Sequence, residues 1–214
     1  MYKKYFKRIL DIILSLSALF VLSPVFLTLI VIGMIKMKGN PFFVQERVGK
    51  NEKVFKLIKF RSMTCQKDKN GKLLPDNMRL TKYGRFIRST SIDEIPELIN
   101  ILLGDMSVIG PRPLLVSYLP WYTEKEKCRH NVRPGLSGLA QVNGRNYLGW
   151  DQRLAYDIKY VENITFLGDV KIILKTIKKA MSREDIAIDT TKTETNLATE
   201  RKEKQKVENN YIVH

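Results

Sequence analysis

Cysteine and histidine are scarce in this chain of 214 residues, which contains two of each. The two cysteines, Cys65 and Cys128, form no CxxC pair, and His130 has no carboxylate or second histidine at a spacing typical of metal ligands, so we interpret it as structural. A disulfide framework and a zinc site are therefore not expected, as is typical of a protein in a reducing compartment. The sequence also lacks a Walker A motif and a GxGxxG motif after a predicted strand, so a standard nucleotide-binding fold is not indicated.

Acidic residues are few compared with basic ones. The chain has 22 aspartates and glutamates against 37 lysines and arginines, a formal net charge of +15. Such a charge favours anionic partners, and nucleic acid, anionic lipid head groups and phosphorylated substrates all qualify. The basic stretches lack interleaved aromatic residues on a recognisable nucleic-acid-binding module, so we expect anionic membrane lipids and phosphorylated substrates rather than nucleic acid.

Charged residues are absent from Ile12 to Ile35. A helix of this length, at about 1.5 Å rise per residue, would cross a hydrocarbon core of roughly 30 Å. Ser23 and Pro24 lie at its middle, where Pro24 removes a backbone hydrogen bond and Ser23 can satisfy the freed groups, so we predict a kink or break there. Positive charge flanks both ends, which favours entry and exit on one membrane face. We predict an uncleaved membrane anchor, either a re-entrant helix-break-helix or a simple kinked spanning helix.

Three further segments are predicted around the centre of the chain. Two β-prone runs, PFFVQERVG and KVFKLIKF, are separated by residues 49–52 and predict a β-hairpin that delivers Lys59 onto the next segment. Met78 to Arg88 is predicted to form a basic amphipathic helix, which either lies on an anionic membrane surface or packs against the core. A second such helix is predicted within Tyr147 to Met181, where apolar residues repeat opposite lysines.

The stretch RSTSIDEIPELINILLGDMSVIGPRP, from Arg88 to Pro113, is the most informative. The helix predicted in it ends at Gly104 and has apolar residues at helical spacing: Ile95, Leu98, Ile99, Leu102 and Leu103. Its start is predicted either as a capping box of Ser91 and Glu94 or with Asp93 as N-cap. In both cases the two acids meet free backbone N–H groups at the positive end of the helix dipole, which favours ionised carboxylates.

Two adjacent ionised carboxylates are suitable ligands for Mg²⁺, and an ionised aspartate can attack phosphorus to form an acyl phosphate. Downstream, Arg112 lies between two prolines that preset its direction, and its planar guanidinium matches phosphate oxygens. The stretch therefore predicts a nucleophile, a metal ligand and a phosphate-binding arginine. The simpler alternative is that Asp93 and Glu94 only cap a helix beside Arg88 and that the Pro-Arg-Pro sequence is a surface turn.

The segment SIDEIPELINILLGDMSVIGPRPLL closely resembles the signature of the bacterial sugar transferase family, the monotopic phosphoglycosyl transferases. The resemblance extends from the N-terminus to about Met181 and includes KFRSMT at Lys59 to Thr64, RPGLSGLAQVNGRN at Arg133 to Asn146 and FLGDVKI at Phe166 to Ile172. The sequence departs from the family pattern at Glu97, where glutamine is usual. The resemblance implies an α/β fold, helix-rich and monotopic, with an N-terminal re-entrant membrane helix (helix-break-helix), a small β-hairpin and membrane-surface amphipathic helices.

The resemblance implies that the enzyme transfers a sugar 1-phosphate from a UDP-sugar to polyprenyl (undecaprenyl) phosphate and releases UMP, at the cytoplasmic face of the bacterial inner membrane. It implies that Asp93 attacks the sugar-linked phosphate and forms a covalent intermediate, while Glu94, together with Asp93, holds Mg²⁺. Asp157 and Asp169 are possible supporting acids, although Asp169 would also be a good N-cap. Substrate contacts are expected from Lys59, Arg88, Arg112, Asn143 and Arg145.

The apolar period is lost from Ser182 onward, and the sequence becomes polar and charged. We predict three parts: a membrane helix at residues 1–38, a cytoplasmic catalytic domain at 39–181 and a disordered tail at 182–214. Two alternatives come from other classes of protein. One is a non-catalytic peripheral membrane adaptor, which would tolerate the loss of Asp93 and Glu94, and the other is a membrane-tethered nucleic-acid-binding protein.

Overall fold

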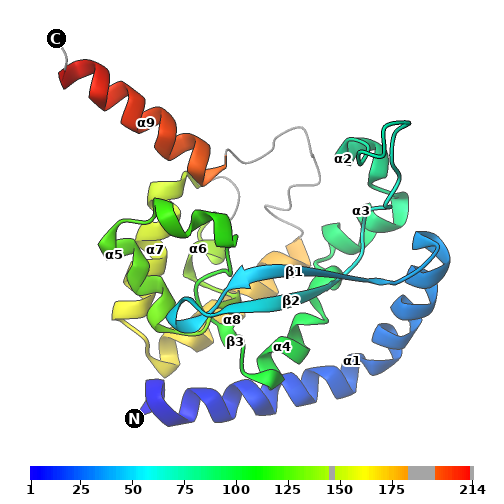
Figure 1. The fold of residues 1–214 in the computed structure, drawn as a ribbon. Coiled ribbons are helices and arrows are strands. Elements are labelled where there is room, and N and C mark those ends of the chain that lie inside the picture. Colours follow the sequence, from blue (N-terminus) through cyan, green and yellow to red (C-terminus); the bar gives the residue numbers. More distant parts are fainter. Residues whose placement is uncertain (145–147, 183–195, 213–214) are drawn as a thin grey trace.

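The computed structural model describes residues 1–144, 148–182 and 196–212 of the chain. Helices surround a β-hairpin that crosses the middle of the molecule (Figure 1). The long N-terminal helix lies along one side, and the C-terminal helix projects from the opposite side (Figure 1). This architecture is the helix-rich α/β fold that the sequence predicts.

The N-terminal helix α1 (Lys7–Met37) follows a π-helical turn at Tyr2–Phe6. It changes direction along its length (Figure 1), as expected of a helix with an internal proline, here Pro24. The Ser23 hydroxyl donates a hydrogen bond of 2.7 Å to the carbonyl of Phe20, the group that Pro24 leaves unpaired. The kink predicted at Ser23 and Pro24 is therefore present within a continuous helix, because this hydrogen bond compensates for the missing one.

The apolar side chains of α1 are largely exposed. Phe20 is 82% exposed and Val21 is 72% exposed, and the helix is long and apolar enough to cross a membrane. A core helix of a soluble protein would bury such residues, so α1 is a membrane-associated helix. Its opposite stripe is buried against the rest of the protein: Asp11, Ser15, Leu29, Gly33 and Met37.

Strands β1 (Phe42–Val48) and β2 (Val54–Phe60) form the predicted antiparallel hairpin. Every residue of one strand has a partner in the other, and the connection between them is η2 (Lys50–Glu52). Phe60 at the end of β2 is buried in a cluster with Leu29 of α1. The hairpin is thus packed against the membrane helix.

The single helix predicted from Met78 to Arg88 is divided into α2 (Asp76–Arg79) and α3 (Lys82–Ser89). Thr81 lies between them, and its hydroxyl accepts the N–H of Gly84 at 2.9 Å. Thr81 is therefore the N-cap that begins a new helix, which explains the division.

Helix α4 (Glu97–Leu103) ends at Gly104, whose φ of 96° is left-handed, as predicted. Its start differs from both predictions, because Pro96 is its N-cap and a 3-10 turn, η3 (Ile92–Glu94), precedes it. Ser91 makes no capping hydrogen bond with its side chain and has a left-handed backbone itself. This conformation redirects the chain after α3, so the two predicted catalytic acids lie in a turn of their own.

The second sheet consists of two short parallel strands, β3 (Ser107–Ile109) and β4 (Gly135–Ser137). The crossover between them contains η4 (Val116–Trp121), α5 (Glu124–Lys127) and η5 (Cys128–Asn131). The helices that follow β4 are α6 (Leu139–Val142), α7 (Trp150–Glu162) and α8 (Phe166–Ser182). Within the crossover, His130 is buried, and burial lowers its pKa to about 4, in keeping with the structural role predicted for it.

A cluster of buried and partly buried polar residues joins the N-terminal helix to α8 and β3. The Asp169 carboxylate accepts hydrogen bonds from the Tyr2 hydroxyl at 2.6 Å, the Lys7 ammonium at 2.7 Å and the Tyr160 hydroxyl at 2.9 Å. The Asp11 carboxylate accepts from a hydroxyl and a backbone N–H of β3, at 2.7 and 2.9 Å. We call these five residues the anchor cluster, because they hold α1 in place on the remainder of the protein.

A further helix, α9 (Leu197–Ile212), lies where the sequence predicts a disordered tail. Its first residue, Leu197, is fully buried in an apolar cluster with Tyr118 and Trp150. Arg201 forms ion pairs with α5 and α7. The prediction is therefore wrong for this helix, because its apolar and charged side chains find partners on the folded domain. Residues 183–195 and 213–214 lie outside the described residues.

Candidate active site

Asp93 and Glu94 open onto a cleft of about 990 Å³. It is bordered by the hairpin, the end of α3, η3, the turn at Arg112 and parts of α6 and α7. The cations that line it are Arg47, Lys59, Arg61, Arg79, Arg88, Arg112, Arg129 and Arg153. The acids are fewer: Asp76, Asp93, Glu94 and Asp157. This excess of cations favours an anionic ligand, and the structure brings three predicted phosphate contacts, Lys59, Arg88 and Arg112, into one cleft with both acids.

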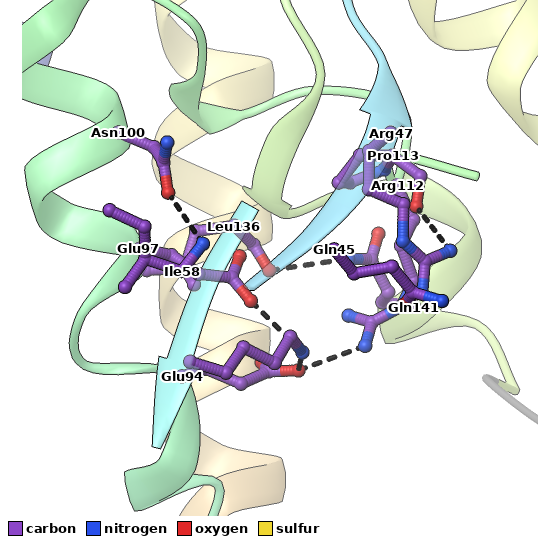
Figure 2. A network of polar contacts seen from close by, with 11 residues as sticks. Gln45, Arg47, Ile58, Glu94, Glu97, Asn100, Arg112, Pro113, Leu136 and Gln141 are labelled. Carbon is purple, nitrogen blue, oxygen red and sulfur yellow. Dashed lines mark hydrogen bonds and ion pairs between the residues drawn. The ribbon is translucent and has the colours of Figure 1, made fainter. Parts of the chain in front are cut away.

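Glu94 is held by two cations from distant parts of the chain. Its Oε1 atom accepts hydrogen bonds from Lys59 Nζ at 2.7 Å and from Arg112 Nη2 at 2.8 Å (Figure 2). Burial opposes the charge of Glu94, but the two cations outweigh burial and hold the pKa of this carboxyl well below its usual range. Glu94 is therefore an ionised carboxylate in a defined position.

Asp93 is the unpaired member of the two acids. Among the described residues its carboxylate has no hydrogen-bond or ion-pair partner. Burial raises the pKa of Asp93 to about 6, and the adjacent charge of Glu94 adds to this shift. The expectation that helix N–H groups favour its ionised form is thus wrong. At neutral pH Asp93 is still mostly ionised, so a reactive carboxylate faces the cleft.

The backbone of the turn that carries Arg112 is buried and is held by hydrogen bonds from two other arginines. Arg129 donates through Nη2 to the Arg112 carbonyl at 2.7 Å and forms a buried ion pair of 2.8 Å with Asp157. Arg47 donates to the carbonyl of Pro113 at 3.4 Å (Figure 2). The alternative of a surface turn is therefore wrong, and Asp157, a possible supporting acid, acts on the site by holding Arg129.

Comparison with known proteins identifies the family. A model described as bacterial sugar transferase matches residues 2–183. The chain belongs to the bacterial sugar transferase family. The predicted family is thus confirmed, and with it the prediction that the protein is a transferase enzyme.

Three relatives of this sugar transferase illustrate the family. The uncharacterised sugar transferase EpsL of Bacillus subtilis is 47% identical over 180 residues, which cover 84% of this chain and 89% of EpsL. The UDP-glucose:undecaprenyl-phosphate glucose-1-phosphate transferase of Klebsiella pneumoniae is 40% identical over 184 residues, or 81% of this chain and 40% of that protein. The undecaprenyl-phosphate galactose phosphotransferase of Salmonella typhimurium is 36% identical over 200 residues, or 85% of this chain and 41% of that protein. The chain therefore spans about two-fifths of the length of the last two relatives.

A third buried acid of the sugar transferase, Glu97, is not among the site residues predicted from the sequence. Its Oε1 atom lies 2.9 Å from Lys59 Nζ, which therefore bridges Glu94 and Glu97 (Figure 2). Burial raises the pKa of Glu97 to about 7, and the charge of Glu94 adds to the shift. We call Lys59, Asp93, Glu94, Glu97 and Arg112 the catalytic cluster.

Asn100 positions Lys59 within this cluster. Its Oδ1 atom accepts the Ile58 N–H at 3.0 Å (Figure 2). Its Nδ2 atom donates to the Lys56 carbonyl at 2.8 Å. Glu97 and Asn100 are buried and three residues apart, so they lie on one face of α4. The sequence contains a signal that could have identified both residues, namely two polar residues at i, i+3 spacing in an otherwise apolar helix.

Some predicted residues of the sugar transferase lie elsewhere. Asn143 donates to the Leu139 carbonyl at 2.8 Å and does not line the cleft, whereas the neighbouring Gln141 does. Asp169 belongs to the anchor cluster and is not an N-cap, since α8 begins at Phe166. Arg145 lies outside the described residues.

The two acids suit a magnesium site that the substrate completes. Within the described ranges no three histidine, cysteine, aspartate or glutamate side chains gather as a ready metal site. Mg²⁺ in phosphate-transferring enzymes commonly takes one or two carboxylates from the protein and its other ligands from phosphates and water. Asp93 and Glu94 supply that number of carboxylates at the cleft, so the donor set fits the expected ion.

Proposed function

We propose that this sugar transferase moves a sugar 1-phosphate from a UDP-sugar to undecaprenyl phosphate, releases UMP and so initiates a lipid-linked glycan. Two relatives are named for undecaprenyl phosphate and a sugar, which supports this substrate class. The observation that carries the proposal is the unpaired carboxylate of Asp93 beside Glu94, which Lys59 and Arg112 hold, in a cleft lined mainly by cations.

In the first step, a carboxylate oxygen of Asp93 attacks the phosphorus atom that carries the sugar. A P–O bond to Asp93 forms, the P–O bond to the bridging oxygen of the diphosphate breaks, and UMP leaves with the electron pair. The phosphosugar is then attached to Asp93 as an acyl phosphate. Arg112 has five N–H donors and Lys59 has three, so both retain donors for phosphate oxygens while they hold Glu94. Arg88, at the edge of the cleft, adds a further cation.

In the second step, a phosphate oxygen of undecaprenyl phosphate attacks the same phosphorus atom. The new P–O bond makes a diphosphate, the acyl phosphate bond breaks, and Asp93 returns as a free carboxylate. This scheme is ping-pong, because UMP leaves before the carrier reacts. When bound, Mg²⁺ neutralises part of the diphosphate charge, and Glu94 together with Asp93 would hold it.

We place the enzyme on the membrane with α1 as a re-entrant anchor and the cleft on the cytoplasmic face. Basic residues at both ends of α1 and its exposed apolar surface support this arrangement. Exposed apolar residues on α8, Phe166, Leu167, Leu174 and Ile177, support contact of a second helix with the lipid surface. The carrier phosphate in the head-group layer would then meet a nucleotide sugar from the cytosol.

The first test is UMP release by the detergent-purified full chain from a panel of UDP-sugars, with undecaprenyl phosphate and Mg²⁺. We expect release with one sugar of the panel from the wild type and from Glu46→Gln, a control that neutralises an exposed acid of β1. We expect none from Asp93→Asn. Normal turnover of Asp93→Asn would overturn the assignment of the nucleophile, and no release with any donor would favour the non-catalytic adaptor.

The covalent intermediate has its own test. With a UDP-sugar labelled in the sugar and no carrier, the denatured wild type should retain the label, and added undecaprenyl phosphate should remove it before denaturation. Asp93→Asn should retain none. Turnover of the wild type without any retained label would indicate direct transfer between the two substrates and would exclude the two-step scheme.

A further inference from the structure

Helix α9 lies beyond the residues that the family model matches, which end at 183, yet it packs against the wall of the cleft. We propose that α9 is a positioning element that holds this wall, formed by η4 and the start of α7, in the conformation that binds the nucleotide-sugar donor. The proposal rests on the proposed function, since it assigns the donor to this part of the cleft.

The apolar contact of α9 lies directly behind the wall. Leu197 is fully buried, in one cluster with Tyr118 of η4 and Trp150 at the first residue of α7. The rings of Tyr118 and Trp150 meet edge to face with centroids 5.3 Å apart, and both residues line the cleft. Leu197 therefore supports two aromatic side chains that face the ligand space.

Charged residues of α9 join two elements of the domain. Arg201 lies 2.6 Å from Glu126 of α5 and 3.0 Å from Asp151 in the first turn of α7. Lys204 lies 2.7 Å from the other oxygen of Asp151. The side chains of Arg201 and Glu126 are 19% and 11% exposed, so this pair is largely shielded from water. These contacts fix the start of α7 relative to α5.

The start of α7 carries side chains into the cleft. Trp150, Arg153 and Asp157 lie on successive turns and all line it. None of the acids of the catalytic cluster contacts α9 in the described structure. Displacement of α9 should therefore weaken ligand binding while the reacting groups keep their arrangement.

The position of α9 indicates that the donor, rather than the lipid carrier, contacts the wall that α9 supports. In Figure 1, α9 lies on the opposite side of the hairpin from most of α1, the membrane-associated helix. A lipid carrier approaches from the side of α1, whereas a soluble nucleotide sugar approaches from water. The wall that α9 supports thus faces the soluble substrate.

The test uses the full chain with Leu197→Asp, which removes the apolar contact, and Arg201→Glu, which reverses the shielded ion pairs. Lys206→Glu, the same charge reversal at an exposed site of α9 with no ion pair in the described part of the chain, is the matched control. The two tryptophans of the chain, Trp121 and Trp150, both lie beside α9, so their fluorescence reports its docking without reference to activity.

We expect both variants to red-shift tryptophan emission and to raise the KM for the UDP-sugar by about tenfold. We expect kcat and the KM for undecaprenyl phosphate to stay within about twofold, and Lys206→Glu to resemble the wild type. Leu197→Asp is the more disruptive change. Arg201→Glu therefore tests the proposal independently, even if the Leu197→Asp variant does not fold.

A red-shifted emission with an unchanged KM for the UDP-sugar would overturn this inference and leave the proposed function in place. Emission that no variant changes would also overturn it, because α9 would then not be docked in solution. A raised KM for the carrier instead of the donor would assign the wall to the lipid. Absence of UMP release by the wild type would overturn the proposed function itself, and with it this inference.

Discussion

The anchor cluster and the catalytic cluster both bury acids beside cations, but they differ in how completely the acids are paired. In the anchor cluster, Asp169 accepts three hydrogen bonds and Asp11 accepts two. The catalytic cluster has three acids but only one lysine and one arginine. Glu94 and Glu97 are paired with these cations, and Asp93 has no partner among the described residues. Complete pairing stabilises a buried acid, whereas incomplete pairing leaves it reactive at a cost in stability.

The comparison predicts opposite effects of removing an acid from the two clusters. Loss of Asp93, the unpaired acid of the catalytic cluster, should abolish activity with little cost in stability. Loss of an acid from the anchor cluster should lower stability while the chemistry at Asp93 persists. The predictions that follow run from the largest expected effect to the smallest.

Asp93→Asn should lower the rate of UMP release by about three orders of magnitude or more, because the amide is a poor nucleophile. Its melting temperature should equal or exceed that of the wild type, since the unpaired buried charge is removed. UMP release and a thermal melt in detergent measure the two effects. A clear fall in melting temperature would show that Asp93 has a stabilising partner and would remove the contrast between the clusters.

Asp169→Ala should destabilise the protein by about 2–4 kcal/mol, because Lys7 and the hydroxyls of Tyr2 and Tyr160 lose their shared acceptor. Labelling of Asp93 by the UDP-sugar in the absence of carrier should persist at low temperature, since the catalytic cluster is untouched. Thermal melts and the labelling experiment test this pair of expectations. A stable variant that loses labelling would place Asp169 in the chemistry.

The first half-reaction should depend on pH through Asp93. With a pKa of about 6, roughly one-tenth of Asp93 is ionised at pH 5 and most is ionised at pH 7. The single-turnover rate of labelling should therefore rise about tenfold from pH 5 to pH 7 and then level off. A rate that is flat over this range would show that Asp93 has an ordinary pKa and is paired in solution.

Glu97→Gln should affect stability more than activity, and only at higher pH. The pKa of Glu97 is raised in the fold from 4.5 to about 7, so the unfolded chain ionises first and stability is lost as the pH rises through this range. Glutamine removes this loss. We expect equal melting temperatures at pH 5 and a gain of roughly 1–3 kcal/mol for the variant at pH 8. The same gain at both pH values would contradict the raised pKa.

Features that depend on residues close together in the sequence were predictable from the sequence. The apolar run of α1, the hairpin, the end of α4 at Gly104 and the presence of Asp93 and Glu94 together all follow from local pattern. The start of α4 was predicted wrongly, because both predicted caps assume a helix that begins before Pro96, whereas Ser91 has a left-handed backbone and a separate 3-10 turn follows it. Helix α9 was missed because Leu197 is apolar but isolated in the sequence and gains its partners only in the fold.

The sequence by itself determined the family, the membrane helix and the identity of two acids that line the cleft, because composition, spacing and a long shared motif carry that information. Only the tertiary structure decided which acid is free to react. Glu94 is paired by Lys59, 35 residues earlier, and by Arg112, 18 residues later, whereas Asp93 next to it is not. Charge pairing in a buried site depends on the distances between side chains after folding, and adjacent residues in the chain can therefore have different partners and different pKa values.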